Sequence, residues 1–386
     1  MSDLGGGGTQ RRFLALAQAF ARAGHRADLV VASAAGDFHD HVPGQARLFA
    51  LDGMSGGPSY LRRRRGLRVA AAAGGLARYL QTETPDVLLS SSNPANLAAL
   101  VARARSAGHH AAPLPVVISV NVDLAAALAG RHRLHGCVLR AMLRRHYPRA
   151  AAVVAISQGV AASVTAIAAV PPARIVTIGN PIDCAAIRRQ AAMPLVHPWL
   201  APGAPPLILA VGKLKPQKDF ETLIRAFAHL RAVRPANLVI LGEGEQRVML
   251  SALVRDLGLG DCVALPGFAD NPYAWLARAA LFVLSSRWEG FSNALAEALA
   301  VGCPVVSTDC PSGPAELLEG GILGPLVPVG DDAALAAAIA AGLDHPCPRD
   351  RLMARADEFS VERAAGRYLD VLEEVTSLAA SGGAAA

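Results

Sequence analysis

The chain has 386 residues, of which 52% are hydrophobic and 18% are charged, and its formal net charge is +6. This length exceeds one ordinary domain and predicts two domains of roughly 150–200 residues each. The high apolar content excludes a disordered chain, because it is enough to build large cores. The positive charge favours anionic partners such as nucleotides, phospholipid headgroups or nucleic acid, without choosing among them.

The residue types that bind metals are present but not arranged as a metal site. The six cysteines are scattered, with no C-x-x-C pair, which favours reduced thiols in a cytoplasmic protein. The stretch DFHDH (residues 37–41) has suitable side chains, but it lies in a loop after a predicted strand, and we assign no metal to it.

Four consecutive glycines, Gly5 to Gly8, open the chain and run into an amphipathic helix pattern over residues 9–23. In that pattern Phe13, Leu16, Ala17 and Phe20 fall on one face. Such a loop usually follows a buried strand and presents backbone N–H groups to a phosphate. Here only four residues precede it.

Short apolar runs alternate with helix patterns through the first half of the chain, which predicts βαβ units and a parallel sheet. We expect strands at residues 28–33, 47–51, 87–90, 116–120, 152–156 and 175–178.

Two basic stretches interrupt this alternation. Arg62–Arg65 is a run of four arginines, and Arg131–Arg149 interleaves arginines with Leu, Val and Met. The second is a basic amphipathic pattern, and we expect both stretches to be candidates for contact with an anionic membrane surface; the alternative is a solvated helix face.

The uncharged segment 150–170 is long enough to span a bilayer. It consists mostly of Ala with several polar residues, so its insertion into a lipid bilayer is only weakly favourable. We therefore interpret it as a buried strand followed by a short helix.

The second half repeats the scheme, with strands expected at residues 207–211, 238–241, 263–265, 281–284, 305–308 and 326–329. A segment rich in Pro and polar residues, 180–206, separates the halves. We expect domains at 1–183 and 184–360, a helix at 361–378 packed on either domain, and a frayed tail at 379–386.

Three lysines follow the first strand of the second half. The stretch VGKLKPQKDF (residues 211–220) contains Lys213, Lys215 and Lys218. Lysines at the carboxyl end of a central strand suit a diphosphate. Taken alone, this stretch also fits solvated surface lysines.

The most informative stretch is SSRWEGFSNALAEALAVG (residues 285–302), a polar loop followed by a helix that begins near Ser292. Free backbone N–H groups at such a helix start form a site for an anion or for sugar hydroxyls. Glu289 lies in the loop and Glu297 lies two turns into the helix. A carboxylate can accept hydrogen bonds from two vicinal hydroxyls, which suits a ribose or a hexose.

Taken together, the ordered motifs are the Gly-rich loop, GKLKPQKDF (212–220), LGEGEQR (241–247), LPGF (265–268), the stretch from SSRWEGF to STDCPSGPAE (285–316) and LVPVGD (326–331). They resemble the family 4 (group 1) retaining glycosyltransferases over essentially the whole chain. The resemblance implies the GT-B fold, with two doubly wound Rossmann-like α/β domains facing across a cleft.

The resemblance also implies the roles of individual residues. Glu289 lies against the donor sugar, Lys218 contacts the donor diphosphate, and Lys213 stands where the family usually has arginine, so it keeps the charge but loses the planar fork. Glu297 accepts hydrogen bonds from the nucleotide ribose. The other implied donor-binding residues are Gly7, Gly8, Gly212, Gly267, Phe268, Gly290, Phe291, Ser292 and Asn293.

The family moves a sugar from a nucleotide donor with retention of configuration and without a metal, which implies no cofactor. The lysines and helix amides would stabilise the leaving diphosphate, and a front-face displacement is the implied mechanism. We expect a UDP-sugar donor, a glycan or lipid-linked acceptor, no nucleic acid, and a role in lipopolysaccharide, capsule or other cell-surface polysaccharide synthesis. The expected location is cytoplasmic or peripheral on the inner membrane face.

The chain departs from the family pattern at one position and leaves other functions open. Many relatives have a histidine where this chain reads SVNVD (residues 119–123), and Asn121 and Asp123 are the two candidates to replace its hydrogen bond. A nucleotide-sugar epimerase on the same scaffold and a donor-binding protein with a decayed site are the alternatives. NAD binding is disfavoured because GGGG is not G-x-G-x-x-G.

The glycine loop carries a further expectation. In the resembling family, a run such as SDLGGGG follows an apolar strand, so Ser2 to Leu4 read as the exit of that strand. Met1 then reads as a start assigned too late or as a true truncation. Loss of a central strand leaves two open sheet edges. We expect no strand before Gly5, and a gap or a collapsed sheet where it belongs.

Overall fold

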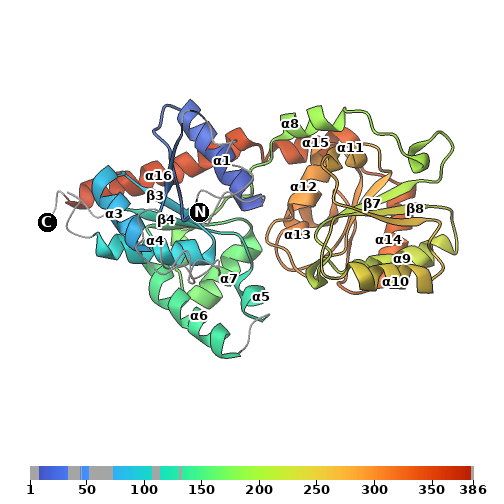
Figure 1. The fold of residues 1–386 in the computed structure, drawn as a ribbon, viewed down its shortest axis with the longest axis horizontal. Helices are drawn as coiled ribbons and strands as arrows, with labels where there is room; N and C mark the ends of the chain where they lie inside the picture. Colours follow the sequence, from blue (N-terminus) through green and yellow to red (C-terminus); the bar gives the residue numbers. More distant parts are fainter. Residues whose placement is uncertain are drawn as a thin grey trace. The chain divides into compact units, whose positions relative to one another are not determined.

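The computed structural model of the chain describes residues 8–33, 44, 46–51, 73–106, 114–129 and 133–383. Its contacts divide the chain into two compact units: residues 1–181 together with 361–386, and residues 182–360. Each unit consists of parallel strands flanked by helices (Figure 1).

The first unit contains a four-stranded and a two-stranded sheet. The larger sheet pairs β3 (Leu88–Ser91), β4 (Val116–Val120), β5 (Ala152–Ala155) and β6 (Ile175–Thr177) in that order. The smaller one pairs β1 (Asp28–Val31) with β2 (Arg47–Ala50), and every pair in both sheets is parallel. All residues of β4 and β5 are buried, as parallel strands covered on both faces require.

Helices cover both sheets of this unit: α1 (Gly8–Arg22), α3 (Ala73–Glu83), α4 (Asn93–Arg105), α5 (Leu124–Ala129), α6 (Arg133–His146), α7 (Gln158–Ala168) and α16 (Val361–Gly383). The last helix packs on the first unit, where Tyr368 and Val371 share a core with Leu16 and Val117. It continues to Gly383, five residues beyond the end at residue 378 that the sequence predicts.

The second unit has one six-stranded parallel sheet in the order β12-β11-β10-β7-β8-β9. Its strands are β7 (Leu207–Val211), β8 (Asn237–Leu241), β9 (Val263–Gly267), β10 (Leu281–Leu284), β11 (Val305–Thr308) and β12 (Leu326–Val327). Its helices are α8 (Cys184–Ala191), α9 (Phe220–Arg231), α10 (Arg247–Asp256), α11 (Pro272–Leu276), α12 (Asn293–Ala300), α13 (Pro314–Leu317), α14 (Asp332–Asp344) and α15 (Arg349–Asp357). A core of fully buried Leu, Ile and Phe side chains joins α9 and α14 to the sheet.

All twelve expected strands are present, with ends that differ by a few residues. The uncharged segment 150–170 forms β5 and α7, as interpreted from its composition. Among the described residues, none of the helices combines the length and the apolar character that crossing a membrane requires.

The two sheets of the first unit are not joined by any strand in the described part of the chain. β1 pairs with β2, β3 pairs with β4, and a cavity of about 750 Å³ lies between β1 and β3. The expected gap concerns residues before Gly8, which lie outside the described residues, so it stays a prediction. The residues before Gly8, the arginines of Arg62–Arg65 and the stretch 37–41 lie outside the described residues, so the expectations on them stay predictions.

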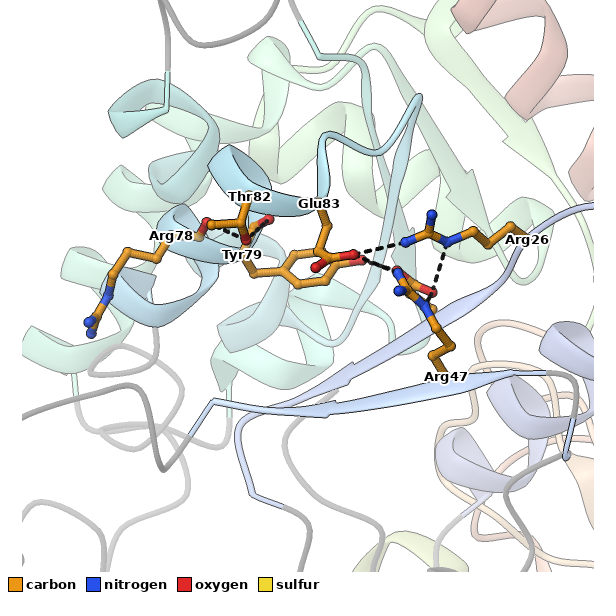
Figure 2. Close-up of polar contacts among 7 residues, drawn as sticks. Arg26, Arg47, Arg78, Tyr79, Thr82 and Glu83 are labelled. Carbon is orange, nitrogen blue, oxygen red and sulfur yellow. Dashed lines mark hydrogen bonds and ion pairs between the residues drawn. The ribbon is translucent and has the colours of Figure 1, made fainter.

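A cluster of charged side chains ties the two-stranded sheet to α3 (Figure 2). Arg47 donates two hydrogen bonds to the Asp28 carboxylate, at 2.9 and 2.6 Å, and a third to Glu83 at 2.7 Å. Arg26 donates to the same Glu83 at 2.8 Å, and the Tyr79 hydroxyl donates to Asp28 at 2.7 Å. Burial, with the Asp28 carboxylate beside it, raises the pKa of Tyr79 far above its usual value.

Candidate active site

The predicted catalytic residues of the second unit gather at the carboxyl ends of β7 and β10, which are neighbours in the sheet. The loop after β7 contains a short 3-10 turn, Pro216–Lys218, and the loop after β10 leads into α12. Parallel sheets of this kind bind ligands at the carboxyl ends of their strands. Sheet order therefore brings together two segments that are 71 residues apart in sequence.

Lys218 and Glu289 form an ion pair at this edge. Lys218 Nζ lies 2.5 Å from Glu289 Oε1, and the two side chains are only 15% and 8% exposed. The Ser286 hydroxyl donates to the same Oε1 at 2.7 Å. Glu289 Oε2 receives no hydrogen bond from any described residue. The pair thus holds the carboxylate in place and leaves one of its oxygens for a ligand.

Polar contacts fix the lysine loop against the glutamate loop. The Ser285 hydroxyl donates to the Lys218 carbonyl at 2.7 Å, and Arg287 lies 3.0 Å from the buried Asp219 carboxylate. Gln217 donates its side-chain amide to the Trp288 carbonyl at 2.7 Å. Sequence reasoning missed these supporting residues, because no local pattern indicates which group each of them contacts.

The start of α12 provides backbone donors next to Glu289. Ser292, the residue before the helix, has a φ of 68°, a left-handed conformation that non-glycine residues adopt at a cost. Its hydroxyl is buried and has no hydrogen-bond partner within the described chain. Gly290, Phe291 and Asn293 lie on either side, so the residues predicted to present their amides to the donor form one continuous segment.

Glycines allow three loops to approach each other at this edge. A Cβ on Gly242 would lie 2.0 Å from the Gly212 carbonyl oxygen, and a Cβ on Gly244 would lie 2.3 Å from the Leu214 carbonyl oxygen. The loop after β8 therefore packs directly on the backbone of the lysine loop. Gly267 ends β9 with a φ of 96°, and a Cβ there would lie 2.8 Å from Glu243 Oε1.

The remaining predicted residues of this unit lie around the ion pair without direct contact to it. Lys213 and Phe268 are exposed, the latter to 74%. Glu297 is half-buried on α12 and accepts from the Tyr273 hydroxyl at 3.5 Å. Partial burial and the neighbouring Lys218 lower the pKa of Lys215, a residue left out of the predicted site.

The first unit contains the other predicted residues. Gly7 lies outside the described residues, and Gly8 is the first residue of α1. Asn121 follows β4 and donates its amide to the Ser91 hydroxyl at 2.6 Å. Asp123 accepts from the Ala126 backbone amide at 2.8 Å at the start of α5.

The two units match family models of carbohydrate-active enzymes. The model described as "Glycosyltransferase Family 4" matches residues 6–186, and the model described as "Glycosyl transferases group 1" matches residues 205–345. This chain belongs to the family 4 (group 1) glycosyltransferases. The resemblance inferred from the motifs is confirmed.

Two curated relatives of this family 4 chain are named as glycosyltransferases. The N-acetylgalactosamine-N,N'-diacetylbacillosaminyl-diphospho-undecaprenol 4-alpha-N-acetylgalactosaminyltransferase of Campylobacter jejuni is 34% identical over 202 residues, 52% of this chain and 53% of the relative. The lipopolysaccharide core biosynthesis glycosyltransferase LpsE of Rhizobium meliloti is 36% identical over 176 residues, which are 44% of this chain and 51% of the relative. The chain spans about half the length of the curated relatives it matches.

Solved structures agree over nearly the whole chain. The apo form of the lipopolysaccharide outer core galactosyltransferase WaaB has a TM-score of 0.74 and 19% identity, covering 97% of both chains. Anabaena HepE in complex with UDP has the same score and identity, covering 97% of this chain and 100% of its own. At this identity the likeness shows the fold alone, which is GT-B.

Proposed function

We propose that this protein is a metal-independent, retaining glycosyltransferase that moves a sugar from a UDP-sugar to a glycan or lipid-linked acceptor in cell-surface polysaccharide synthesis. The ion pair of Lys218 and Glu289 at the carboxyl ends of β7 and β10 carries this proposal. The relatives include two proteins named as lipopolysaccharide core biosynthesis glycosyltransferases, which supports a role in cell-surface polysaccharide synthesis.

In the proposed donor site, different residues around that pair bind different parts of the nucleotide sugar. Lys218, with Lys213 of the same loop, would hold the diphosphate. The free Oε2 of Glu289 would accept from a sugar hydroxyl, and Glu297 would accept from the ribose. The amides before α12 would donate to the sugar or phosphate oxygens.

The proposed reaction needs no metal, because two lysines and the helix amides supply the positive charge that a leaving diphosphate requires. Transfer measured in excess EDTA should match transfer in buffer. A rate that falls with chelation and returns with Mg²⁺ or Mn²⁺ would contradict this part of the proposal.

Retention is proposed through a front-face displacement in which the leaving phosphate helps to deprotonate the acceptor hydroxyl. Proton NMR of the first product formed should show the anomeric configuration of the donor. A product with the opposite anomeric configuration would overturn the proposed retention.

A UDP-sugar is the favoured donor, and the likeness to HepE, solved with UDP and with UDP-glucose, supports it. A thermal-shift screen across UDP-, GDP- and ADP-sugars determines which nucleotide base the donor site prefers. Binding to the native state raises the melting temperature as the ligand concentration exceeds the dissociation constant. UDP-sugars should give the largest shift.

The acceptor end of the proposal involves a membrane surface. Leu134, Val138 and Met142 form an exposed apolar stripe along α6, and Arg140 and Arg145 are exposed on the same helix. This combination suits a surface rich in anionic lipid. We propose that α6 docks the protein peripherally on the cytoplasmic face of the inner membrane, where a lipid-linked acceptor is presented.

A further inference from the structure

A buried arginine lies at the carboxyl ends of β3 and β4, which are neighbours in the larger sheet of the first unit. Arg12 of α1 is only 5% exposed. Its Nη2 donates to the Ser91 hydroxyl of β3 at 2.7 Å and to the Ser119 hydroxyl of β4 at 3.4 Å. Its Nη1 donates to Asn180 Oδ1 at 2.8 Å. Parallel sheets of this kind bind ligands at this edge.

The positive charge of Arg12 has no negative partner in the described part of the chain. All three groups that accept hydrogen bonds from it are neutral side chains. The Nε is buried and has no hydrogen-bond partner. Burial lowers the pKa of Arg12, and the nearby Tyr368 acts in the opposite direction. A buried cation destabilises a protein unless an anion pairs with it, so this guanidinium calls for an anionic partner.

The Ser91 hydroxyl has a hydrogen that no described residue accepts. Ser91 is 2% exposed, and its oxygen accepts from Arg12 and, at 2.6 Å, from the Asn121 amide. A hydroxyl has two lone pairs and one hydrogen, so both lone pairs are used and the hydrogen is left over. The cluster therefore has more donors than acceptors. Water can accept these hydrogen bonds, but it does not neutralise the charge.

Asn121 extends the cluster to the surface of the first unit. Its side chain is partly exposed, and its Oδ1 accepts from the Ser119 hydroxyl at 3.1 Å. Together with the bond to Ser91, this contact fixes which end of the amide carries the N–H groups. One hydrogen on Nδ2 is given to Ser91, and no described residue accepts the other. A ligand that arrives at this edge thus meets an oriented amide donor.

We propose that Arg12, Ser91 and Asn121 bind an acidic acceptor sugar through its carboxylate or phosphate group. The acidic group pairs with the guanidinium and accepts from the Ser91 hydroxyl, and Asn121 donates to a neighbouring oxygen of the sugar. Guanidinium groups suit both acids, because their planar fork matches two oxygens at once. The role of this sugar as acceptor rests on the proposed function, whereas its binding does not.

The test uses nucleotide-free protein labelled with ¹⁵N-arginine, and glucuronate and glucose 6-phosphate are the probes. The Nε–H signal of Arg12, assigned by its loss in Arg12→Lys, should shift in a saturable manner with either probe at constant ionic strength. Glucose, which has no acidic group, should leave the signal in place. An equal shift with glucose, or no shift with either acid, would overturn the proposal.

Two further anions separate an acceptor sugar from other sources of negative charge. Inorganic phosphate should bind at least tenfold more weakly than glucose 6-phosphate, because it lacks the sugar that Asn121 contacts. Equal affinities would assign the cluster to free phosphate and overturn the proposal. UDP should not displace glucuronate, and displacement would place the donor diphosphate here and also overturn it. Binding of glucuronate without any thermal shift by UDP would contradict the proposed function and support the anion site.

Variants of the cluster check the location. Arg12→Met should abolish glucuronate binding, whereas Arg22→Met, at the exposed last turn of the same helix, should bind as the wild type does. Ser91→Ala keeps the guanidinium and should weaken binding several-fold. Should Arg12→Met fail to fold, the wild-type signal and Ser91→Ala still decide. Unchanged glucuronate affinity in Ser91→Ala would show that the cluster only supports the fold, and would overturn the proposal.

Discussion

Lys218 and Glu289, from the ends of two neighbouring strands, neutralise each other in a nearly buried ion pair, with Nζ 2.5 Å from Oε1. Each of them is also predicted to contact the donor. A bound diphosphate would attract the ammonium group, and a sugar hydroxyl would donate to the carboxylate. In the proposed site, contacts to the donor would therefore replace a contact within the protein.

Lys218→Met should destabilise the protein by about 3 kcal/mol, because it leaves a buried carboxylate without its cation. Adding Glu289→Gln to that variant should recover part of the loss, since a neutral amide costs less to bury. Urea denaturation of the two variants measures both effects. Lys213→Met is the control: the side chain is exposed, so stability should change by less than about 0.5 kcal/mol while donor binding weakens.

Ser292→Gly should stabilise the fold by about 1 kcal/mol, because glycine adopts a φ of 68° without the penalty that serine has. Ser292→Ala keeps the strain and removes a hydroxyl that has no partner in the described chain, so its stability should stay within about 0.5 kcal/mol of the wild type. Both should weaken donor binding in a calorimetric titration. A large loss of stability in Ser292→Ala would show that the hydroxyl has a structural role instead.

Gly242→Ala should cost at least about 3 kcal/mol, because the new Cβ would lie 2.0 Å from the Gly212 carbonyl oxygen and would push the lysine loop aside. Gly258→Ala is the matched control. Gly258 also has a positive φ, 67°, but open space around it, so only the conformational cost of about 1–2 kcal/mol applies. Thermal unfolding of both variants measures the difference. Equal losses would contradict the close approach of the two loops.

Burial raises the pKa of the Cys303 thiol to about 12, and burial with the Glu289 charge raises the pKa of Cys310 to about 12. At pH 8 both thiols are therefore protonated and unreactive. Cys137 is exposed on α6. Mass spectrometry after iodoacetamide treatment of the native protein should find Cys137 modified first. Cys303 and Cys310 should react only after denaturation.

Reversal of charge on α6 tests the proposed membrane surface. Arg140→Glu with Arg145→Glu should reduce flotation with anionic vesicles at least tenfold at low salt, because each basic side chain contributes about 1 kcal/mol of attraction. Val138→Asp should also reduce flotation, because it places a charge in the exposed apolar stripe of α6. Arg231→Glu, an exposed position in the second unit, is the control and should bind as the wild type does. A wild type that ignores the vesicles would end this part of the proposal.

The strands and the main site residues could be predicted because their signals are local. An apolar run such as Val116–Val120 is buried on both faces, and a parallel strand needs that pattern. Glu289 and Lys218 were predicted from motifs, and the structure brings them together. The supporting contacts of Ser285 and Ser286 were not predicted, because a serine after a strand does not indicate which carbonyl or carboxylate it will meet.

The sequence by itself determined where strands and helices form and which loops carry the charged residues, since these follow from periodicity and composition. Only the tertiary structure decided that α16 packs on the first unit and that Arg12 is buried beside Ser91. Each of these depends on which distant segments become neighbours. That choice is made by the burial of whole surfaces, and no local pattern specifies it.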